Sequence, residues 1–509
     1  MILNIKYYIL TMLMLVSIVN VNCKGQEMKN EVRKPVFADQ FYPADPVKLK
    51  KALEDYFKDA VVKNTGKPAA LIAPHAGYIF SGQIAADAYN QARNFKYDLV
   101  IILGTNHTTA GFNKIGIYPG DAYSTPLGEA IIDKQTAEAL IQSDDDCVYN
   151  SEVHAKEHSI EVQLPFIQYL FPGVKILPMV IGIPDKDMCE EFGRVLAGII
   201  KDKNPLIVAS SDLSHYPSYD DAEKVDKQTL QEIIKMSPGN LSSKIQKQMS
   251  GDVPNLVTCA CGECPIIAAM TAAKELGAGT GTIISYANSG DSIVGNKDRV
   301  VGYGAVVFSD KKVEEGTNEN INAGSKTFEL SESNKKALLE FARKTITQYL
   351  NTGTVPAARG FDPILENKMG AFVTLRKHHE LRGCIGYMME DLPLCRVVGA
   401  MALQAALNDT RFLPVTIDEL QDIEIEISVL TPYKEIKSID EIELGKDGVL
   451  LKKGGRQSVF LPQVATEMGW NKIEFLENLC RKAGLSSDSW KDAQLFTFQA
   501  KIFEESEFK

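Results

Sequence analysis

The 509-residue sequence lacks an excess of basic residues: 55 lysines and arginines stand against 66 aspartates and glutamates, for a formal net charge of −11. Because a nucleic-acid partner requires a basic surface, this balance argues against one. The sequence also lacks a low-complexity tract and an internal repeat, so ordinary globular domains are expected. A chain of this length is too long for a single core, and two or three domains are predicted.

The N-terminus lacks an apolar run long enough for a membrane span. Tyr7 to Val19 is an uncharged run behind Lys6, shorter than the ~20 residues that a span needs and typical of a signal-peptide core. Cys23 follows, as in bacterial lipoprotein signals, although Asn22 stands where these usually carry a small residue. We therefore expect residues 1–23 to direct export to the periplasm or cell surface, with Cys23 lipidated and membrane contact limited to this segment. An uncleaved N-terminal anchor is the alternative.

Cysteines are sparse, nine in the chain, but Cys259, Cys261 and Cys264 cluster within TCACGECP. Disulfide-stapled folds have dense, regular cysteines, so most are expected to be buried thiols or ligands. A structural zinc site or an iron–sulfur cluster needs about four ligands, and the C-x2-C pair of Cys261 and Cys264 has no second pair. A disulfide from Cys264 to Cys259 or to Cys261 stays open, and the latter would remove Cys261 as a ligand.

Residues 309–327 are polar and lack apolar periodicity, which predicts a linker between a first domain, 33–308, and a second, 328–509. In the first domain short apolar runs alternate with helical patterns, typical of an α/β fold whose central sheet is covered by helices on both faces. The strand-like runs are 69–74, 98–104, 175–182, 205–211, 281–287 and 299–308.

Histidine is scarce, with seven residues in the chain, yet three directly follow predicted strands: His75, His107 and His215, the last with Asp212 nearby. In open α/β sheets ligands bind beyond the carboxyl ends of the strands, so these side chains can converge. One such histidine alone would more often be structural, but three together favour a site.

Histidine is the commonest metal ligand near neutral pH, and two histidines with an anionic third ligand leave open positions for water, oxygen or substrate. Cys261 fits the third position, because it lies just ahead of a helix-like stretch whose N-terminus would favour its thiolate. Glu263 is a weaker, carboxylate candidate.

HAKEH, His154 to His158, is a competing motif, because it matches the H-x-x-E-H pattern of zinc proteases. On one helix, His154 and His158 would share a face, with Glu157 as the base. Such a protease also needs a glutamate ligand on a second helix, which the sequence does not mark. The alternative is that EHSIEVQLPFIQYLF forms a helix packed on the core, with His158 and Glu161 at the rim of the pocket.

Eight segments in order resemble the Memo family over 33–308: VFADQFYPAD, LIAPHAGYIFSG, ILGTNH, STPLGEA, EHSIEVQLPF, SSDLSHY, CGECPI and GYGAVVF. That family is similar in fold to class III extradiol dioxygenases, ring-opening enzymes that use non-haem Fe(II). The resemblance implies that His75, His107 and Cys261 bind metal, and that Asp212 and His215 lie in the pocket.

The second domain resembles the AMMECR family over 330–505, through GAFVTLRKHHELRGCIGY, ALNDTRFLPVTIDEL, IEISVLTP and GVLLKKGGRQSVFLPQV. The resemblance implies a smaller α+β domain of no established activity. Relatives of both halves are associated with a radical-SAM protein in the AmmeMemoRadiSam system, and the chain resembles a fusion of its components B and A. The resemblance implies a radical-SAM protein as a partner.

From the residues of the second domain alone, GGRQSVFLP predicts a hairpin turn that enters a strand. Arg382 could hold an anion, and Cys384 lies among glycines that permit a tight backbone. The plainer interpretation is a buried cysteine in a turn beside a surface arginine. His378 and His379 are expected to be exposed in a loop.

Two main functional hypotheses follow. The first is a redox enzyme with one metal ion, Fe(II) or Cu favoured and Zn as the alternative, since a thiolate suits copper or zinc better than a carboxylate does. His215 would act as acid or base, and Asp212 would orient it. The second is a non-catalytic module that holds the metal, or docks a small molecule or peptide, in the same pocket.

Overall fold

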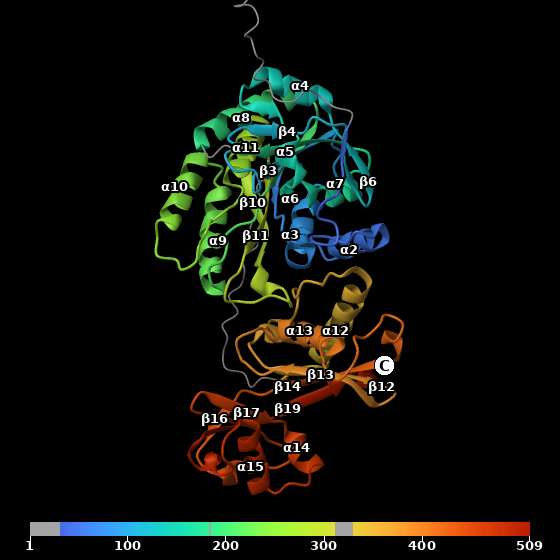
Figure 1. Ribbon diagram of the computed structural model, residues 1–509, viewed down its shortest axis with the longest axis vertical. Coiled ribbons are helices and arrows are strands. Elements are labelled where there is room, and N and C mark those ends of the chain that lie inside the picture. The colour runs from blue at the N-terminus through green and yellow to red at the C-terminus, as the bar shows by residue number, and fades with distance from the viewer. Residues whose placement is uncertain (1–30, 183–184, 311–328, 509) are drawn as a thin grey trace, which may run out of the picture. The chain divides into compact units, whose positions relative to one another are not determined.

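The computed structural model describes residues 31–182, 185–310 and 329–508. They cluster into two compact units, one within 1–290 and 295–316 and the other within 291–294 and 317–509 (Figure 1). The predicted signal over 1–23 with Cys23, and all but the first two residues of the predicted linker, lie outside the described residues. Among the helices that are described, none combines the length and the apolar character that crossing a membrane requires.

The first unit is built on an eight-stranded sheet of order β10-β11-β2-β9-β3-β8-β4-β7. Its four central strands, β2, β9, β3 and β8, run parallel, and β10 and β11 pair antiparallel at one side. All six predicted strand runs are strands. The bounds are β2 (Pro68–Ala73), β3 (Leu99–Thr105), β4 (Ile115–Ile117), β7 (Cys147–Tyr149), β8 (Lys175–Ile181), β9 (Pro205–Ser210), β10 (Thr280–Asn288) and β11 (Gly302–Ser309). A small second sheet joins β1 (Val32–Arg33), β5 (Ala122–Thr125) and β6 (Gly128–Ile131).

Helices cover both faces of the large sheet, as predicted (Figure 1). One face carries α4 (Lys134–Ser143), α8 (Lys186–Ile200), α9 (Tyr219–Ile233), α10 (Pro238–Met249) and α11 (Glu263–Glu275). The other carries α2 (Pro46–Lys58), α3 (Tyr78–Asn90), α5 (Glu152–Ala155), α6 (His158–Glu161) and α7 (Leu164–Leu170). Because successive side chains of a strand point to opposite faces, a strand buried on both sides must be apolar throughout.

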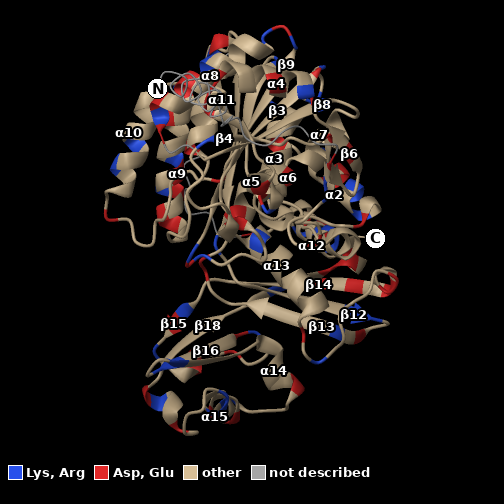
Figure 2. Cartoon of the chain, turned by 45° about the horizontal axis from the view of Figure 1, so that its top comes forward, with Lys and Arg blue, Asp and Glu red and all other residues tan. Residues whose placement is uncertain are grey.

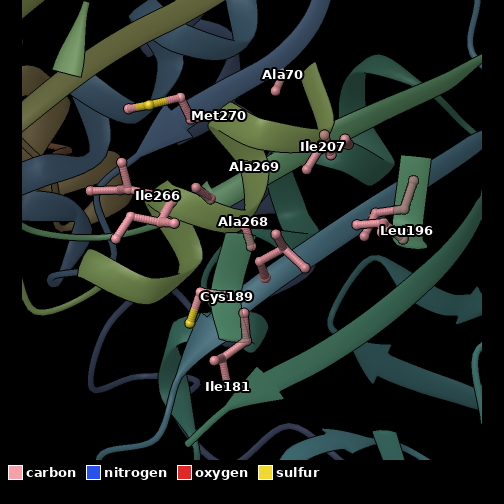
Figure 3. Packing of buried hydrophobic residues seen from close by; sticks show 14 of the residues in the cluster. Ala70, Ile181, Cys189, Leu196, Ile207, Ile266, Ala268, Ala269 and Met270 are labelled. Atoms are coloured by element: carbon pink, nitrogen blue, oxygen red, sulfur yellow. The ribbon is translucent and has the colours of Figure 1, made fainter. Parts of the chain in front are cut away.

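Strand β3 illustrates this double burial: Leu99, Ile101 and Leu103 enter the cluster under α8 and α11, whereas Val100 and Ile102 enter the cluster under α2 and α3. Figure 3 shows the first cluster, in which residues of α8 and α11 pack on the strands. The labelled side chains are Ala70, Ile181, Cys189, Leu196, Ile207, Ile266, Ala268, Ala269 and Met270.

Charged residues of both signs are interspersed along the outer helices α8 and α9, and α10 carries lysines only, while the central strands are nearly free of charge (Figure 2). The charged side chains of this unit therefore lie on its helices rather than on the central sheet.

The single helix predicted for EHSIEVQLPFIQYLF is wrong, because two short helices, α6 and α7, take its place. Pro165 lies in the first turn of α7, where its missing N–H costs nothing, whereas inside a continuous helix it would break a hydrogen bond. The helix begins where the segment predicts, with Glu157 as the N-cap and His158 as the first residue of α6, and the break lies between Glu161 and Leu164.

The second unit contains two four-stranded antiparallel sheets with helices, and so is α+β. In the first, of order β13-β12-β14-β19, the strands are β12 (Ala371–Lys377), β13 (Glu380–Tyr387), β14 (Ile423–Leu430) and β19 (Ala500–Glu504), with α12 (Glu332–Thr352) and α13 (Leu394–Leu407). In the second, of order β15-β18-β16-β17, they are β15 (Lys434–Ile436), β16 (Gly448–Lys453), β17 (Arg456–Phe460) and β18 (Gln494–Phe498), with α14 (Pro462–Glu467) and α15 (Lys472–Lys482).

Two hairpin turns of this unit confirm sequence predictions. Gly454 and Gly455 join β16 to β17 with φ of 55° and 76°, as a two-residue hairpin loop requires. His378 and His379 join β12 to β13 with φ of 52° and 68°, and both are exposed. These two histidines therefore form the turn of the β12–β13 hairpin.

Candidate metal centre

Three histidine side chains meet beyond the carboxyl ends of the central strands. His75 lies two residues after β2, His107 two residues after β3, and His158 begins α6. One ring nitrogen from each lies within 4.8 Å of the others, and the ring centroids are 4.6 to 5.2 Å apart. Because only β9 separates β2 from β3 in the sheet, the two strand-end histidines arrive at the same place. The cluster can hold one metal ion.

A glycine in β3 lets α6 approach the sheet. A Cβ at Gly104 would lie 2.5 Å from Ser159 Oγ, too close for any side chain. With glycine there, Thr105 N donates to Ser159 Oγ at 3.1 Å. This contact fixes the first turn of α6 against the end of β3, and so places His158 beside His107.

The ring of His75 is held in one tautomer. Ser210 Oγ donates to Ser159 O at 2.6 Å and accepts from Gln163 Nε2 at 2.8 Å, so toward His75 Nδ1, 3.0 Å away, it can only accept. Nδ1 of His75 therefore carries the proton. Nε2 is left with its lone pair, which is the form that binds a metal.

Glu157 does the same for His107. Its Oε1 accepts from His107 Nδ1 at 2.9 Å, and its Oε2 accepts from His107 N at 2.8 Å. Burial alone would raise the pKa of Glu157, but the hydrogen bonds from His107 and from Ser159 N lower it to about 2. The ionised carboxylate holds the proton of His107 on Nδ1 and leaves Nε2 free for a ligand bond.

His75 and His158 are neutral at physiological pH. Burial, followed by the charge of His107, lowers the pKa of His75 to about 3, and burial, followed by His75, lowers that of His158 to about 4. The His75 side chain is 2% exposed, whereas His107 and His158 are 27% and 20% exposed. A ligand can therefore reach the cluster from the side of His107 and His158.

Cys261 lies against the same cluster, with its Sγ 3.3 Å from His75 Nε2. It precedes α11 and is stabilised by Asp212 N, which donates to its sulfur at 3.3 Å. Burial, followed by the charge of Asp212, nevertheless raises the pKa of the thiol, so the thiolate expected from the helix N-terminus is not favoured by the protein alone. A cation beside it would reverse this, because a coordinated thiol loses its proton.

Asp212 and His215 lie in the loop after β9, but Asp212 does not set the tautomer of His215 as expected. Its Oδ1 accepts from His75 N at 2.8 Å. His215 Nδ1 instead donates to Leu213 O at 3.0 Å, so in a neutral ring Nε2 is the acceptor atom. Burial raises the pKa of Asp212, and the charge of His215 opposes that shift. The backbone carbonyl therefore orients His215, while Asp212 positions His75.

A buried carboxylate behind this loop anchors it. Asp226 of α9 accepts from Ser214 N at 2.8 Å, from Ser214 Oγ at 3.0 Å and from Tyr286 OH at 2.9 Å. Burial raises its pKa to about 7, and these hydrogen bonds offset only part of the shift. The folded protein therefore binds a proton at Asp226 more tightly than the unfolded chain does.

This difference predicts that the contribution of Asp226 to stability is complete below pH 4 and is lost as the pH rises through about 7. Asp226→Asn keeps the neutral form, so we expect its stability relative to the wild type to increase between pH 5 and pH 8, by at most about 1.4 kcal/mol per pH unit. Urea unfolding at both pH values measures it, with exposed Asp202→Asn as the control. A stability difference independent of pH would contradict the prediction.

Glu161, expected at the rim of the pocket, is fully buried instead. Its carboxylate accepts from Arg33 Nη1 at 2.6 Å, from Phe37 N at 2.8 Å and from Tyr42 OH at 2.7 Å, and also from Val36 N at 3.0 Å. These bonds fasten the segment 33–42 to α6. They hold the rings of Phe37 and Phe41 5.6 and 5.0 Å from that of His158, so the segment forms one wall of the site.

The protease hypothesis from HAKEH fails on geometry. His154 belongs to α5 and His158 to α6, with Glu157 between them, so the two histidines do not share a helical face. Both nitrogens of His154 are used: Tyr123 OH donates to Nδ1 at 2.5 Å, and Nε2 donates to Gly116 O at 2.8 Å. His154 is a buried structural residue.

The eight described cysteines are all free, so the alternative of a disulfide within TCACGECP does not occur among them. Cys264 forms a hydrogen bond with Cys189 of α8, which together with burial raises the pKa of Cys189. Glu263, the carboxylate candidate, accepts from Ser242 Oγ of α10 at 2.6 Å and is not one of the clustered groups.

In the second unit, Cys384 lies within strand β13 rather than in a turn, and its sulfur accepts from Thr374 Oγ1 at 3.2 Å. Arg382 is only 15% exposed at its side chain and pairs with Glu419 at 2.7 Å. The anion that Arg382 holds is therefore internal to this unit.

Sequence reasoning missed three features of the centre: Glu157 and Ser210 as partners that orient His107 and His75, and His158 as a member of the cluster. The position of Glu157 directly before His158 gave a signal, but it was interpreted as the base of a protease. Ser210 gave none, because a serine at a strand end is common in any α/β sheet.

Comparison with known proteins gives two family matches, which confirm both resemblances. The Memo-like protein family matches residues 33–307 and the AMMECR1 family matches residues 339–503. A MEMO1 family protein of Desulfurococcus amylolyticus is 35% identical over 291 residues, covering 54% of this chain and 98% of the relative. One of Methanopyrus kandleri is 36% identical over 293 residues, with the same coverage. A crystal structure of an uncharacterized protein from Pyrococcus horikoshii is 38% identical, covers 33% of this chain and 90% of that protein, and has a TM-score of 0.31.

Proposed function

The chain belongs to the Memo-like protein family over residues 33–307 and carries an AMMECR1 domain over 339–503, and from this premise we propose that its first unit is a redox enzyme. In this proposal the unit binds one metal ion, Fe(II) or Cu, and oxidises a phenolic or similar small molecule. The observation that carries the proposal is the convergence of His75, His107 and His158, whose ligand atoms lie within 4.8 Å of one another.

The donor set fits such an ion. Ser210 and Glu157 engage Nδ1 of His75 and His107, so Nε2 of each ring is the atom that can bind the metal. The sulfur of Cys261 lies 3.3 Å from His75 Nε2 and can join as a further donor. Imidazole and thiolate ligands suit Fe, Cu or Zn, whereas Mg and Ca prefer oxygen ligands. Zn is the alternative occupant, and it would not support redox chemistry.

The bound metal would supply Lewis acidity and one-electron chemistry toward oxygen and the substrate. Because Nδ1 of His215 donates to Leu213 O, Nε2 is the atom through which the neutral ring would accept the proton of a substrate hydroxyl group. His215 is near enough to influence the pKa values of His75 and Asp212. The rings of Phe37 and Phe41 lie 5.6 and 5.0 Å from that of His158 and would contact a substrate that enters beside it.

Oxygen uptake tests this proposal. The full chain, purified without oxygen and loaded with Fe(II) or Cu, is expected to consume oxygen when a phenol or catechol is added, while the Zn-loaded and metal-free proteins do not. An oxygen electrode and mass analysis of the substrate measure the reaction. Tight metal binding without oxygen uptake for any phenol would contradict it and would favour the alternative of a non-catalytic metal or peptide holder.

A further inference from the structure

A cavity of about 450 Å³ lies in the second unit, away from the residues considered above. Most of the residues that line it belong to β12 and β13 of one sheet, to β17 of the other sheet, and to α14 and α15. Figure 1 labels these elements. Small-molecule sites usually have volumes of roughly 300–1,000 Å³. Neither Arg382 nor Cys384 lines this cavity, and Gly386 is the one residue of the segment LRGCIG, 381–386, that does.

The walls of this cavity are mostly apolar, with three aromatic rings among them and with Gln457 and Lys482 as the polar side chains. They include Phe372, Tyr387, Met389, Val459, Phe460 and Val464. Met389 is 54% exposed, and methionine adapts its shape to a ligand more readily than branched side chains do. Apolar walls with aromatic rings favour a ligand with a flat, apolar body.

The position of one of these rings is determined by a glycine. A Cβ at Gly386 would lie 2.1 Å from Cδ1 of Phe372, on the neighbouring strand. Only glycine therefore allows the Phe372 ring to lie across β13. Gly386 therefore determines where this part of the wall lies.

Lys482, the last residue of α15, supplies the cation that lines the cavity. Its Nζ donates to Val459 O at 3.0 Å and lies 4.8 Å from the centroid of the Phe460 ring. Burial lowers the pKa of Lys482, and no carboxylate among the described residues opposes that shift. Lys482 is exposed, and no ion pair is found for it within the described parts of the chain, so its ammonium group can offer its other N–H donors to a ligand at the mouth of the cavity.

We propose that this cavity binds a small aromatic carboxylate, with its ring among Phe372, Tyr387 and Phe460 and its carboxylate on Lys482 Nζ. One ammonium group balances one negative charge. A phosphate group carries about two charges at neutral pH and usually engages arginine or several donors. This site goes beyond the proposed oxidation in the first unit and does not depend on it.

Titration of the full chain with arylacetates tests the site. Phenylacetate and indole-3-acetate are expected to bind saturably with one site per chain in isothermal titration calorimetry. Their neutral amides have the same rings and should bind at least about tenfold more weakly, the loss expected of one charge-assisted hydrogen bond. Equal binding of acid and amide, or no saturable binding of either acid at millimolar concentration, would overturn the proposal.

Lys482→Met should weaken binding of the acids by at least about tenfold and leave the amides unchanged. Lys452→Met is the matched control, because Lys452 also lies over an aromatic ring, Phe496 at 5.2 Å, but does not line the cavity. Full affinity of Lys482→Met for the acids would refute the site. Because the acid and amide comparison needs no variant, a Lys482→Met protein that failed to fold would not remove the test. The arylacetates are titrated into metal-free protein, in which the proposed oxidation cannot occur. The result for this cavity is therefore independent of the result for the first unit.

Discussion

Replacing His75 with alanine is expected to lower the metal affinity of the chain by more than about 100-fold, since the loss of an outer hydrogen-bond partner of a ligand alone costs roughly 10–100-fold. His75 is the most buried member of the cluster, and its Nε2 lies beside Cys261 Sγ. Alanine removes one ligand atom, and water cannot easily take its place because the His75 side chain is only 2% exposed. Competition titration with Fe(II), Cu(I) and Zn(II) under anaerobic conditions measures the change.

Two further variants provide comparisons for the His75→Ala result. Glu157→Gln keeps the shape but loses the charge that holds the proton on His107 Nδ1, so we expect a smaller loss, roughly 10–100-fold. His154→Ala removes an equally buried histidine that lies outside the cluster, so metal content should be unchanged while stability falls. If His75→Ala retained full affinity, the cluster would not be the metal site.

The same titration decides which group completes the ligand set. His158 is the third member of the geometric cluster, whereas the family resemblance implies Cys261. A larger loss in His158→Ala than in Cys261→Ser would show that three imidazoles carry the binding. The opposite order would show that Cys261 binds as a thiolate and that His158 lines the open side of the site.

Replacing Glu161 with alanine is expected to destabilise the first unit by roughly 3–5 kcal/mol, because it leaves the buried Arg33 without its counter-charge. It also leaves Phe37 N and the Tyr42 hydroxyl without their acceptor. Urea unfolding of the full chain, followed by hydrogen exchange on peptides of 31–182, separates this unit from the other. The segment that carries Phe37 and Phe41 should exchange first.

Two controls accompany the Glu161 prediction. Asp55→Ala breaks the largely exposed pair with Lys51 on α2 and should cost less than about 1 kcal/mol. Arg33→Met combined with Glu161→Leu removes both buried charges, and should recover much of the stability that Glu161→Ala loses. A loss in Glu161→Ala no larger than that in Asp55→Ala would mean that the buried pair does not fasten this segment.

Six of the eight strands of the large sheet could be predicted from sequence, because strands buried on both faces must be apolar throughout and stand out between helical patterns. The pairing of the strands could not be predicted from sequence. The antiparallel pairing of β10 with β11, and of β11 with β2, was therefore not foreseen. Segment EHSIEVQLPFIQYLF shows another limit: its apolar spacing suits a helix, yet Pro165 splits it into α6 and α7.

The sequence by itself determined that histidines follow the strands that become β2 and β3, and this made a convergent site predictable. It also determined both family resemblances, since those depend on the order of motifs alone. Only the tertiary structure decided that His158 joins His75 and His107, that Glu157 and Ser210 set their tautomers, and that Glu161 is buried against Arg33. Each of these depends on contacts between residues distant in the chain, and periodicity along the chain carries information only about neighbours within one helix or strand.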